Sequence, residues 1–81
     1  MKLWIGNLAP ETSDADLNAF LQRYGLPPCT AIQRVAGDGS RPGALVSFVA
    51  IDDAALYHAA LRLDGVYWNR HSLNVLVLQR M

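Results

Sequence analysis

The chain has 81 residues, 52% of them hydrophobic, and its 7 lysines and arginines are balanced by 7 aspartates and glutamates. A chain of this size forms a single domain, and its apolar content is sufficient for a core, which excludes an intrinsically disordered protein. A net charge of zero excludes the strongly basic class of nucleic-acid-binding proteins, in which electrostatic attraction dominates the affinity.

Scarce cysteine and histidine limit the chemistry of the chain. Cys29 is the single cysteine and is accompanied only by His58 and His71, so there is neither an intramolecular disulfide nor a Cys/His zinc set. We therefore expect no metal and no other cofactor. The unpaired cysteine, and N-terminal residues without a secretory-signal pattern, predict a cytoplasmic protein. No apolar run approaches the roughly 18 residues of a membrane span, so no membrane partner is expected.

The first part of the chain predicts a strand followed by a helix. Residues 2–6 alternate in the manner of a half-buried strand. Ser13 is a suitable N-cap for a helix, because Asp16 stands three residues later as in a capping box. Apolar residues then recur at the spacing of one helix face, namely Leu17, Phe20, Leu21 and Tyr24. Gly25 closes this helix.

The second part predicts further strands and a second helix. Asp52 is a suitable N-cap, and Gly65 ends the helix in a left-handed turn. The inward stripe of this helix consists of Leu56, Ala59, Ala60 and Leu63. Residues 66–71 form a hairpin-like return that carries Tyr67 and Trp68. The remaining strands are expected at residues 30–35, 43–49 and 72–78.

The predicted element order is β-α-β-β-α-β, the split β-α-β arrangement of an α+β, ferredoxin-like domain. In this arrangement two helices cover one face of a four-stranded antiparallel sheet, and the other face is open. Residues 1–81 form this single domain. Function is therefore expected on a flat sheet surface rather than in a cleft.

The order of elements, together with two of the strands, resembles the RNA recognition motif (RRM) family over essentially the whole chain. That family has a hexamer in its first strand and an octamer in its third, and RNA bases stack on the aromatic rings that they display. Residues 3–8, LWIGNL, match the hexamer, and Trp4 stands where the family has its first stacking ring. The resemblance implies an RRM-like domain that binds RNA on the open sheet face.

The octamer departs from the family pattern. Residues 41–48 read RPGALVSF, and their core-facing positions fit the pattern. Gly43 and Leu45 stand where two stacking rings are expected. The resemblance therefore assigns a stacking role to Trp4 alone and a phosphate contact to Arg41.

Alternation along the predicted strands places one set of side chains on the open face. This set consists of Trp4, Gly6, Gly43, Leu45, Ser47, Asn74, Leu76 and Leu78. The second strand fits two orientations, in which either Gln33 and Val35 or Ile32 and Arg34 face outwards.

The first hypothesis is that single-stranded RNA binds this face with weak to moderate affinity. Trp4 would stack a base, and Leu45, its neighbour if the first and third strands are adjacent, would pack against a ring or a ribose. Arg41 would contact phosphate, with Lys2, Arg34 and Arg80 as further candidates. The predicted RNA-binding residues are Trp4, Arg41, Leu45, Ser47, Asn74, Leu76, Gln79 and Arg80.

The alternative hypothesis is a protein–protein interaction or homodimerisation module. Exposed apolar patches mark such surfaces, and tryptophan is enriched among their dominant residues. The patch would consist of Trp4, Leu45, Leu76 and Leu78. The intact hexamer favours RNA, whereas the missing rings favour a protein partner. In a third arrangement the sheet binds RNA while a partner binds the helix side or Tyr67 and Trp68, although the resemblance makes Trp68 a core residue.

Enzymatic activity is not predicted. His58 lies among helix residues and His71 lies in a return loop, and neither belongs to a nucleophile signature. The GDG sequence at residues 37–39 lacks the lysine and hydroxyl residue of a phosphate-binding loop and leads into a strand.

Overall fold

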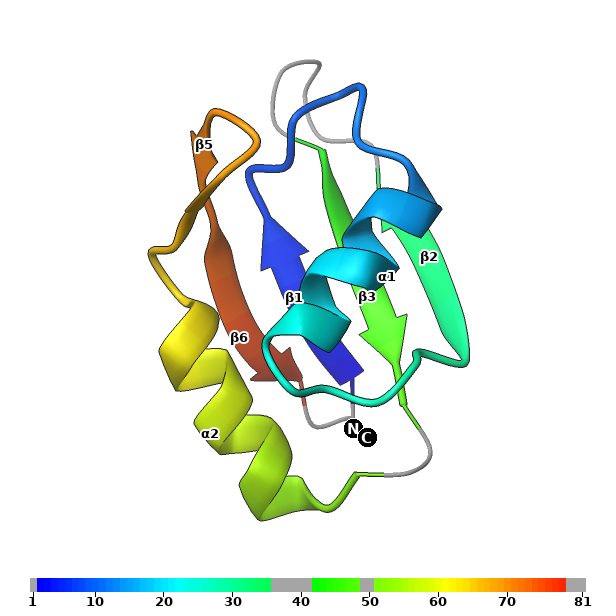
Figure 1. The fold of residues 1–81 in the computed structure, drawn as a ribbon, viewed down its shortest axis with the longest axis vertical. Helices are drawn as coiled ribbons and strands as arrows, with labels where there is room; N and C mark the ends of the chain where they lie inside the picture. The colour runs from blue at the N-terminus through cyan, green and yellow to red at the C-terminus, as the bar shows by residue number, and fades with distance from the viewer. Residues whose placement is uncertain (1, 36–41, 49–50, 79–81) are drawn as a thin grey trace.

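The computed structural model describes residues 2–35, 42–48 and 51–78. Its elements are β1 (Lys2–Gly6), α1 (Asp14–Arg23), β2 (Ala31–Val35), β3 (Gly43–Ser47), α2 (Asp53–Leu63), β4 (Tyr67–Trp68), β5 (His71–Ser72) and β6 (Asn74–Leu78). The long elements follow the predicted order, and the short strands β4 and β5 form the predicted hairpin between α2 and β6 (Figure 1).

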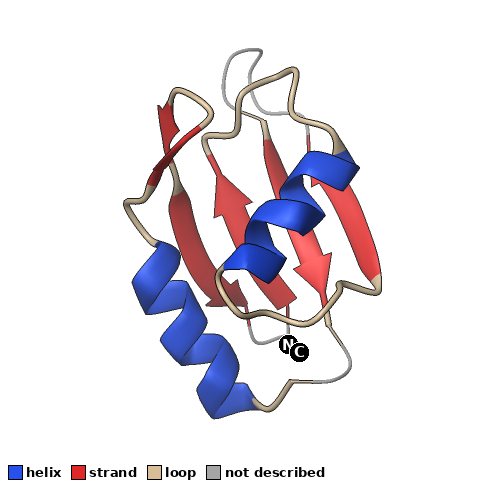
Figure 2. Ribbon diagram, in the orientation of Figure 1, coloured by secondary structure: helices blue, strands red, loops and turns tan. Residues whose placement is uncertain are grey.

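Four strands form one antiparallel sheet in the order β2-β3-β1-β6, so β1 and β3 lie in its middle. Both helices lie on the same face of this sheet, with α1 in front of the central strands and α2 towards β6 (Figures 1 and 2). The predicted α+β, ferredoxin-like fold is confirmed. The face opposite the helices is the open face, and it is covered by no helix or strand of the described residues.

Local sequence determines where each helix starts. The hydroxyl of Ser13 accepts a hydrogen bond from the N–H of Asp16 at 3.0 Å, and the Asp16 carboxylate accepts one from the N–H of Ser13 at 3.4 Å. This is the predicted capping box. The carboxylate of Asp52 accepts a hydrogen bond from the N–H of Ala55 at 2.8 Å and caps α2, also as predicted.

The core lies between the helices and the inner face of the sheet. Its fully buried side chains include Leu3, Ile5, Ala44 and Val46 from the sheet, Leu17 and Leu21 from α1, and Leu63 from α2. The rings of Phe20 and Trp68 stack with centroids 4.3 Å apart and planes 19° apart. Trp68 therefore packs against the core, as the resemblance to the RRM family implied.

The last predicted strand is interrupted in the structure, which corrects the expectation of one strand over residues 72–78. β5 and β6 are separated at Leu73, whose N–H donates to the carbonyl of Val66 at 2.9 Å. The Leu73 carbonyl accepts a hydrogen bond from the N–H of Gly65 at 2.8 Å. The chain that follows α2 thus covers part of this outer sheet edge, which limits pairing with other strands. β2 and the described part of β3 are slightly shorter than the predicted strands.

Candidate nucleic-acid interface

The strand register arranges the side chains of the open face in rows. Trp4 of β1 lies directly opposite Leu45 of β3 on one side and Leu76 of β6 on the other. Gln33 of β2 lies beyond Leu45 and completes this row. The predicted proximity of Trp4 and Leu45 is confirmed, and the indole is flanked on both sides by aliphatic side chains.

Two further rows flank the row of Trp4. The row at one end contains Ser47, Lys2 and Leu78, and the row at the other end contains Gly43, Gly6 and Asn74. Every described residue that was predicted on the open face therefore lies there. The structure brings together five of the predicted RNA-binding residues, namely Trp4, Leu45, Ser47, Asn74 and Leu76.

The orientation of β2, which the sequence left open, is decided by its pairing with β3. Ile32 pairs with the buried Val46, so Ile32 and Arg34 face the helices. Arg34 donates hydrogen bonds to the carbonyl of Thr12 and to the carboxylate of Asp14, both at 2.9 Å. The expectation that Arg34 contacts phosphate on the open face is therefore wrong, because its guanidinium is engaged on the opposite face.

The indole of Trp4 leans over two glycines of the next row. A β carbon on Gly43 would lie 2.3 Å from Cη2 and 2.6 Å from Cζ2 of the ring, and one on Gly6 would lie 3.0 Å from Nε1. All three separations are shorter than an optimal contact between heavy atoms, which is about 3.5–4.0 Å. The half-buried indole therefore occupies space that a side chain on Gly43 would need.

Exposed apolar side chains continue from this face around the β6 edge of the sheet. Leu76 and Leu78 expose 47% and 41% of their surface, and Leu61 on α2 exposes 77%. α2 and β6 enclose a groove of about 250 Å³, lined mainly by apolar residues that include Leu61 and Leu76. The most exposed members of the predicted protein-binding patch thus lie at this edge rather than at Trp4.

A polar cluster that sequence reasoning missed lies near the glycine end of the open face. Asn7 has a left-handed φ of 63°, and its amide donates a hydrogen bond to the carbonyl of Ser72 at 2.8 Å. Its Oδ1 lies 3.5 Å from Nδ1 of His71. The local signal is an asparagine directly after β1, since asparagine tolerates left-handed backbone. The partners are distant in sequence and meet only through the pairing of β1 with β6.

Three predicted RNA-binding residues lie outside the described residues, namely Arg41, Gln79 and Arg80. Their roles stay predictions. Within the described part of the chain, no group of three or more His, Cys, Asp or Glu side chains is placed to hold a metal ion. None of the helices formed by the described residues is long and apolar enough to cross a membrane.

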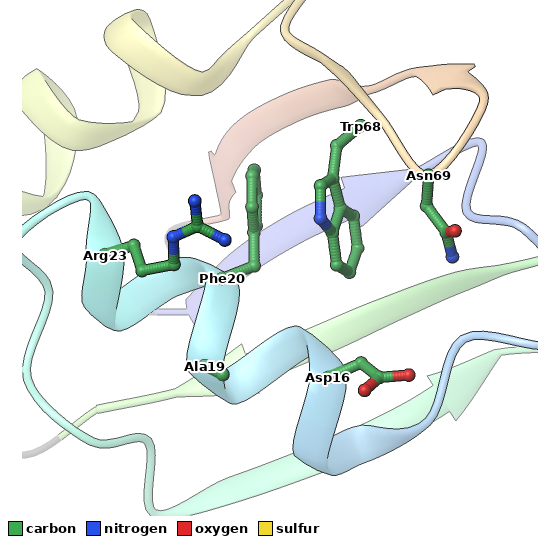
Figure 3. Close-up of a pocket in the computed structure, with 6 residues that line it drawn as sticks. All are labelled: Asp16, Ala19, Phe20, Arg23, Trp68 and Asn69. Atoms are coloured by element: carbon green, nitrogen blue, oxygen red, sulfur yellow. The ribbon is translucent and has the colours of Figure 1, made fainter.

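A pocket of about 350 Å³ lies on the helix side of the sheet, between α1 and the β4–β5 hairpin (Figure 3). The stacked rings of Phe20 and Trp68 line it, together with Asp16, Arg23 and Asn69. In the third arrangement considered above, a partner would bind in this region. Trp68 is half-buried here, stacked on Phe20 and packed against the core.

Solved structures of other proteins resemble this chain closely in fold but only weakly in sequence. No protein-family model matches the chain, and no curated protein matches it. The third RRM of Pes4 superposes with a TM-score of 0.78 at 21% identity, over 99% of this chain and 93% of that one. An RRM of Rna15, solved with bound RNA, superposes with a TM-score of 0.74 at 13% identity, over 98% of this chain and 83% of that one.

The N-terminal three RNA binding domains of the yeast splicing factor Prp24 also match. The TM-score is 0.79 at 17% identity, and the match covers 98% of this chain and 33% of that one. The protein therefore has the RRM fold, as its sequence predicted. One fold can carry different functions, so the function of this chain depends on the residues that it places on the sheet.

Proposed function

We propose that this protein binds single-stranded RNA on the open face of its sheet, with weak to moderate affinity. The observation that carries the proposal is the position of Trp4, which lies on this face between Leu45 and Leu76. A base that stacks on an aromatic side chain gains about 1–3 kcal/mol, whatever its identity. The structural likeness to an RRM with bound RNA supports the same reading.

Polar groups around the indole suit the edges of a base and its sugar. Asn74 lies in the row next to Trp4 and is exposed, and its amide can both donate and accept hydrogen bonds. The hydroxyl of Ser47 suits a ribose 2′-OH, the group that distinguishes RNA from DNA. Leu45 and Leu76 offer apolar surface to a ring or a ribose on either side of the indole.

Electrostatic attraction has a small part in this proposal. Lys2 is the one cation on the described part of the open face, and Arg41 and Arg80 are the further predicted phosphate contacts. Few neutralised phosphates give a low affinity and a weak dependence on salt. The role we propose is binding, without catalysis.

The proposal is tested by NMR titration of amide shifts with short mixed-sequence single-stranded RNA, using the wild type and Trp4→Ala. We expect shifts around Trp4, Leu45, Ser47 and Asn74, and an affinity about tenfold lower in the variant, because one stacking contact is lost. Tyr67→Ala is the matched control, since Tyr67 is 71% exposed on β4, outside the four-stranded sheet. It should bind as the wild type does.

Two outcomes would contradict the proposal. RNA shifts that Trp4→Ala leaves unchanged would move the binding site away from the open face. If RNA causes no shifts and the sheet residues broaden as the protein concentration rises, the apolar patch is an interface for self-association, as in the alternative hypothesis.

A further inference from the structure

The contact between Trp4 and the two glycines determines how much stacking surface the open face offers. Gly6 and Gly43 lie side by side on the central strands, and the indole lies across both. Any residue larger than glycine at position 43 would bring its β carbon to 2.3 Å from the ring. The indole therefore fills the space above β3 that a side chain at this position would otherwise occupy.

Trp4 is also the sole aromatic ring among the described residues of the open face. Its fused rings reach from β1 over β3, with Nε1 the ring atom nearest to a β carbon on Gly6 and Cη2 the one nearest to a β carbon on Gly43. A ring held in one orientation by packing loses little conformational freedom when a base stacks on it, which favours binding.

We propose that Gly6 and Gly43 form a seat that lays Trp4 flat, and that the open face therefore stacks one base on this indole instead of two consecutive bases on two rings. The inference rests on the proposed RNA-binding function. Gly6 and Gly43 act as positioning residues, because they orient the ring that contacts RNA without providing a side chain of their own.

The seat is tested first in the free protein by NMR. The ring current of an indole shifts protons beneath it upfield, so the α protons of Gly6 and Gly43 should resonate upfield of ordinary glycine values and return to them in Trp4→Leu. In Gly43→Ala the Gly6 protons should also return, because the new β carbon displaces the ring. Val35→Ala, beside Gly43 on β2, is the matched control and should leave them unchanged.

Ordinary Gly6 shifts in the wild type, or upfield shifts that persist in Gly43→Ala, would overturn the seat.

The positioning role is tested by RNA affinity. Gly43→Ala should bind the mixed-sequence RNA at least about fivefold more weakly than the wild type, since the stacking surface is misplaced. Unchanged affinity in this variant would overturn the positioning role.

The one-base inference is tested with abasic RNA hexamers that carry either one central base or two adjacent ones. The one-base hexamer should lose affinity in Trp4→Ala, and the second base should raise affinity in the wild type by no more than about threefold. A gain of about tenfold or more would reveal a second stacking site and overturn the inference. If no hexamer and no fully based RNA binds, the proposed function fails and the one-base inference fails with it. The ring-current measurement tests the seat independently.

Discussion

Lys2 and Arg34 lie on opposite faces of the sheet. Lys2 is exposed on the open face, in the row next to Trp4. Arg34 faces α1 and forms an ion pair with Asp14 in which the two side chains are 33% and 59% exposed. The position of a cation in the strand, and not its presence in the sequence, decides whether it can meet RNA on this face.

At the same scale, we predict that Arg34→Ala leaves RNA affinity unchanged. The free energy of unfolding should fall by about 1–2 kcal/mol, because the variant loses the partly exposed ion pair with Asp14 and the hydrogen bond to the carbonyl of Thr12. Lys2→Ala, the matched comparison, should weaken RNA binding and reduce the slope of log Kd against log salt by about 0.7, the value for one phosphate on a single strand. Fluorescence anisotropy and urea denaturation measure the two quantities. Weaker RNA binding by Arg34→Ala would contradict the assignment.

At the scale of elements, the β4–β5 hairpin contains two consecutive residues in the left-handed region. Asn69 and Arg70 have φ angles of 54° and 70°, which is the backbone of a type I′ turn. The Asn69 amide donates a hydrogen bond to the hydroxyl of the buried Thr12 at 2.8 Å and ties the hairpin to the loop before α1. Arg70 is exposed, and its β carbon is sterically unfavourable in this left-handed backbone conformation, which favours glycine.

We therefore predict that Arg70→Gly raises the free energy of unfolding by about 1 kcal/mol, since glycine removes the steric cost of left-handed backbone. Urea denaturation measures this change. Arg70→Ala removes the same charge but keeps the β carbon, so it should give no such gain. Equal stability of the two variants would show that the turn is not strained at this position.

At the scale of the whole molecule, the hydrophobic core and the proposed binding surface lie on opposite faces of the sheet. The core, the Phe20–Trp68 stack and the pocket beside it lie on the helix side, whereas Trp4 and its row lie on the other side of the sheet. The chain as a whole carries no net charge. RNA binding by this molecule should therefore depend on stacking at one place more than on its overall electrostatic field.

This arrangement predicts that the affinity for RNA depends only weakly on salt concentration. The slope of log Kd against log salt should stay below about 2 in magnitude, as expected when only two or three phosphates of a single strand are neutralised. Anisotropy titrations from low to moderate salt measure it. A steep slope that survives in Trp4→Ala would show that phosphate contacts, and not the indole, dominate the affinity.

Local patterns in the sequence were sufficient to predict the element order, the helix caps and the outward residues of three strands. Ser13 and Asp52 cap their helices through atoms three residues away, so the signal is contained in one helical turn. Trp4, Leu45 and Leu76 face outwards because each strand alternates clearly with its buried neighbours. Such short-range interactions can be predicted from the sequence without knowledge of the fold.

Tertiary structure alone decided the orientation of β2, the interruption at Leu73 and the seat of Trp4. The apolar residues Ile32 and Val35 of β2 are three positions apart, so they point to opposite faces of the strand and do not show which face is buried. Only the pairing of β2 with β3 determines the orientation. The seat depends on Gly43, which lies far from Trp4 in the sequence and reaches it only through the β1–β3 register. These features are set by contacts between distant segments, whereas alternation and capping are set by the sequence within each segment.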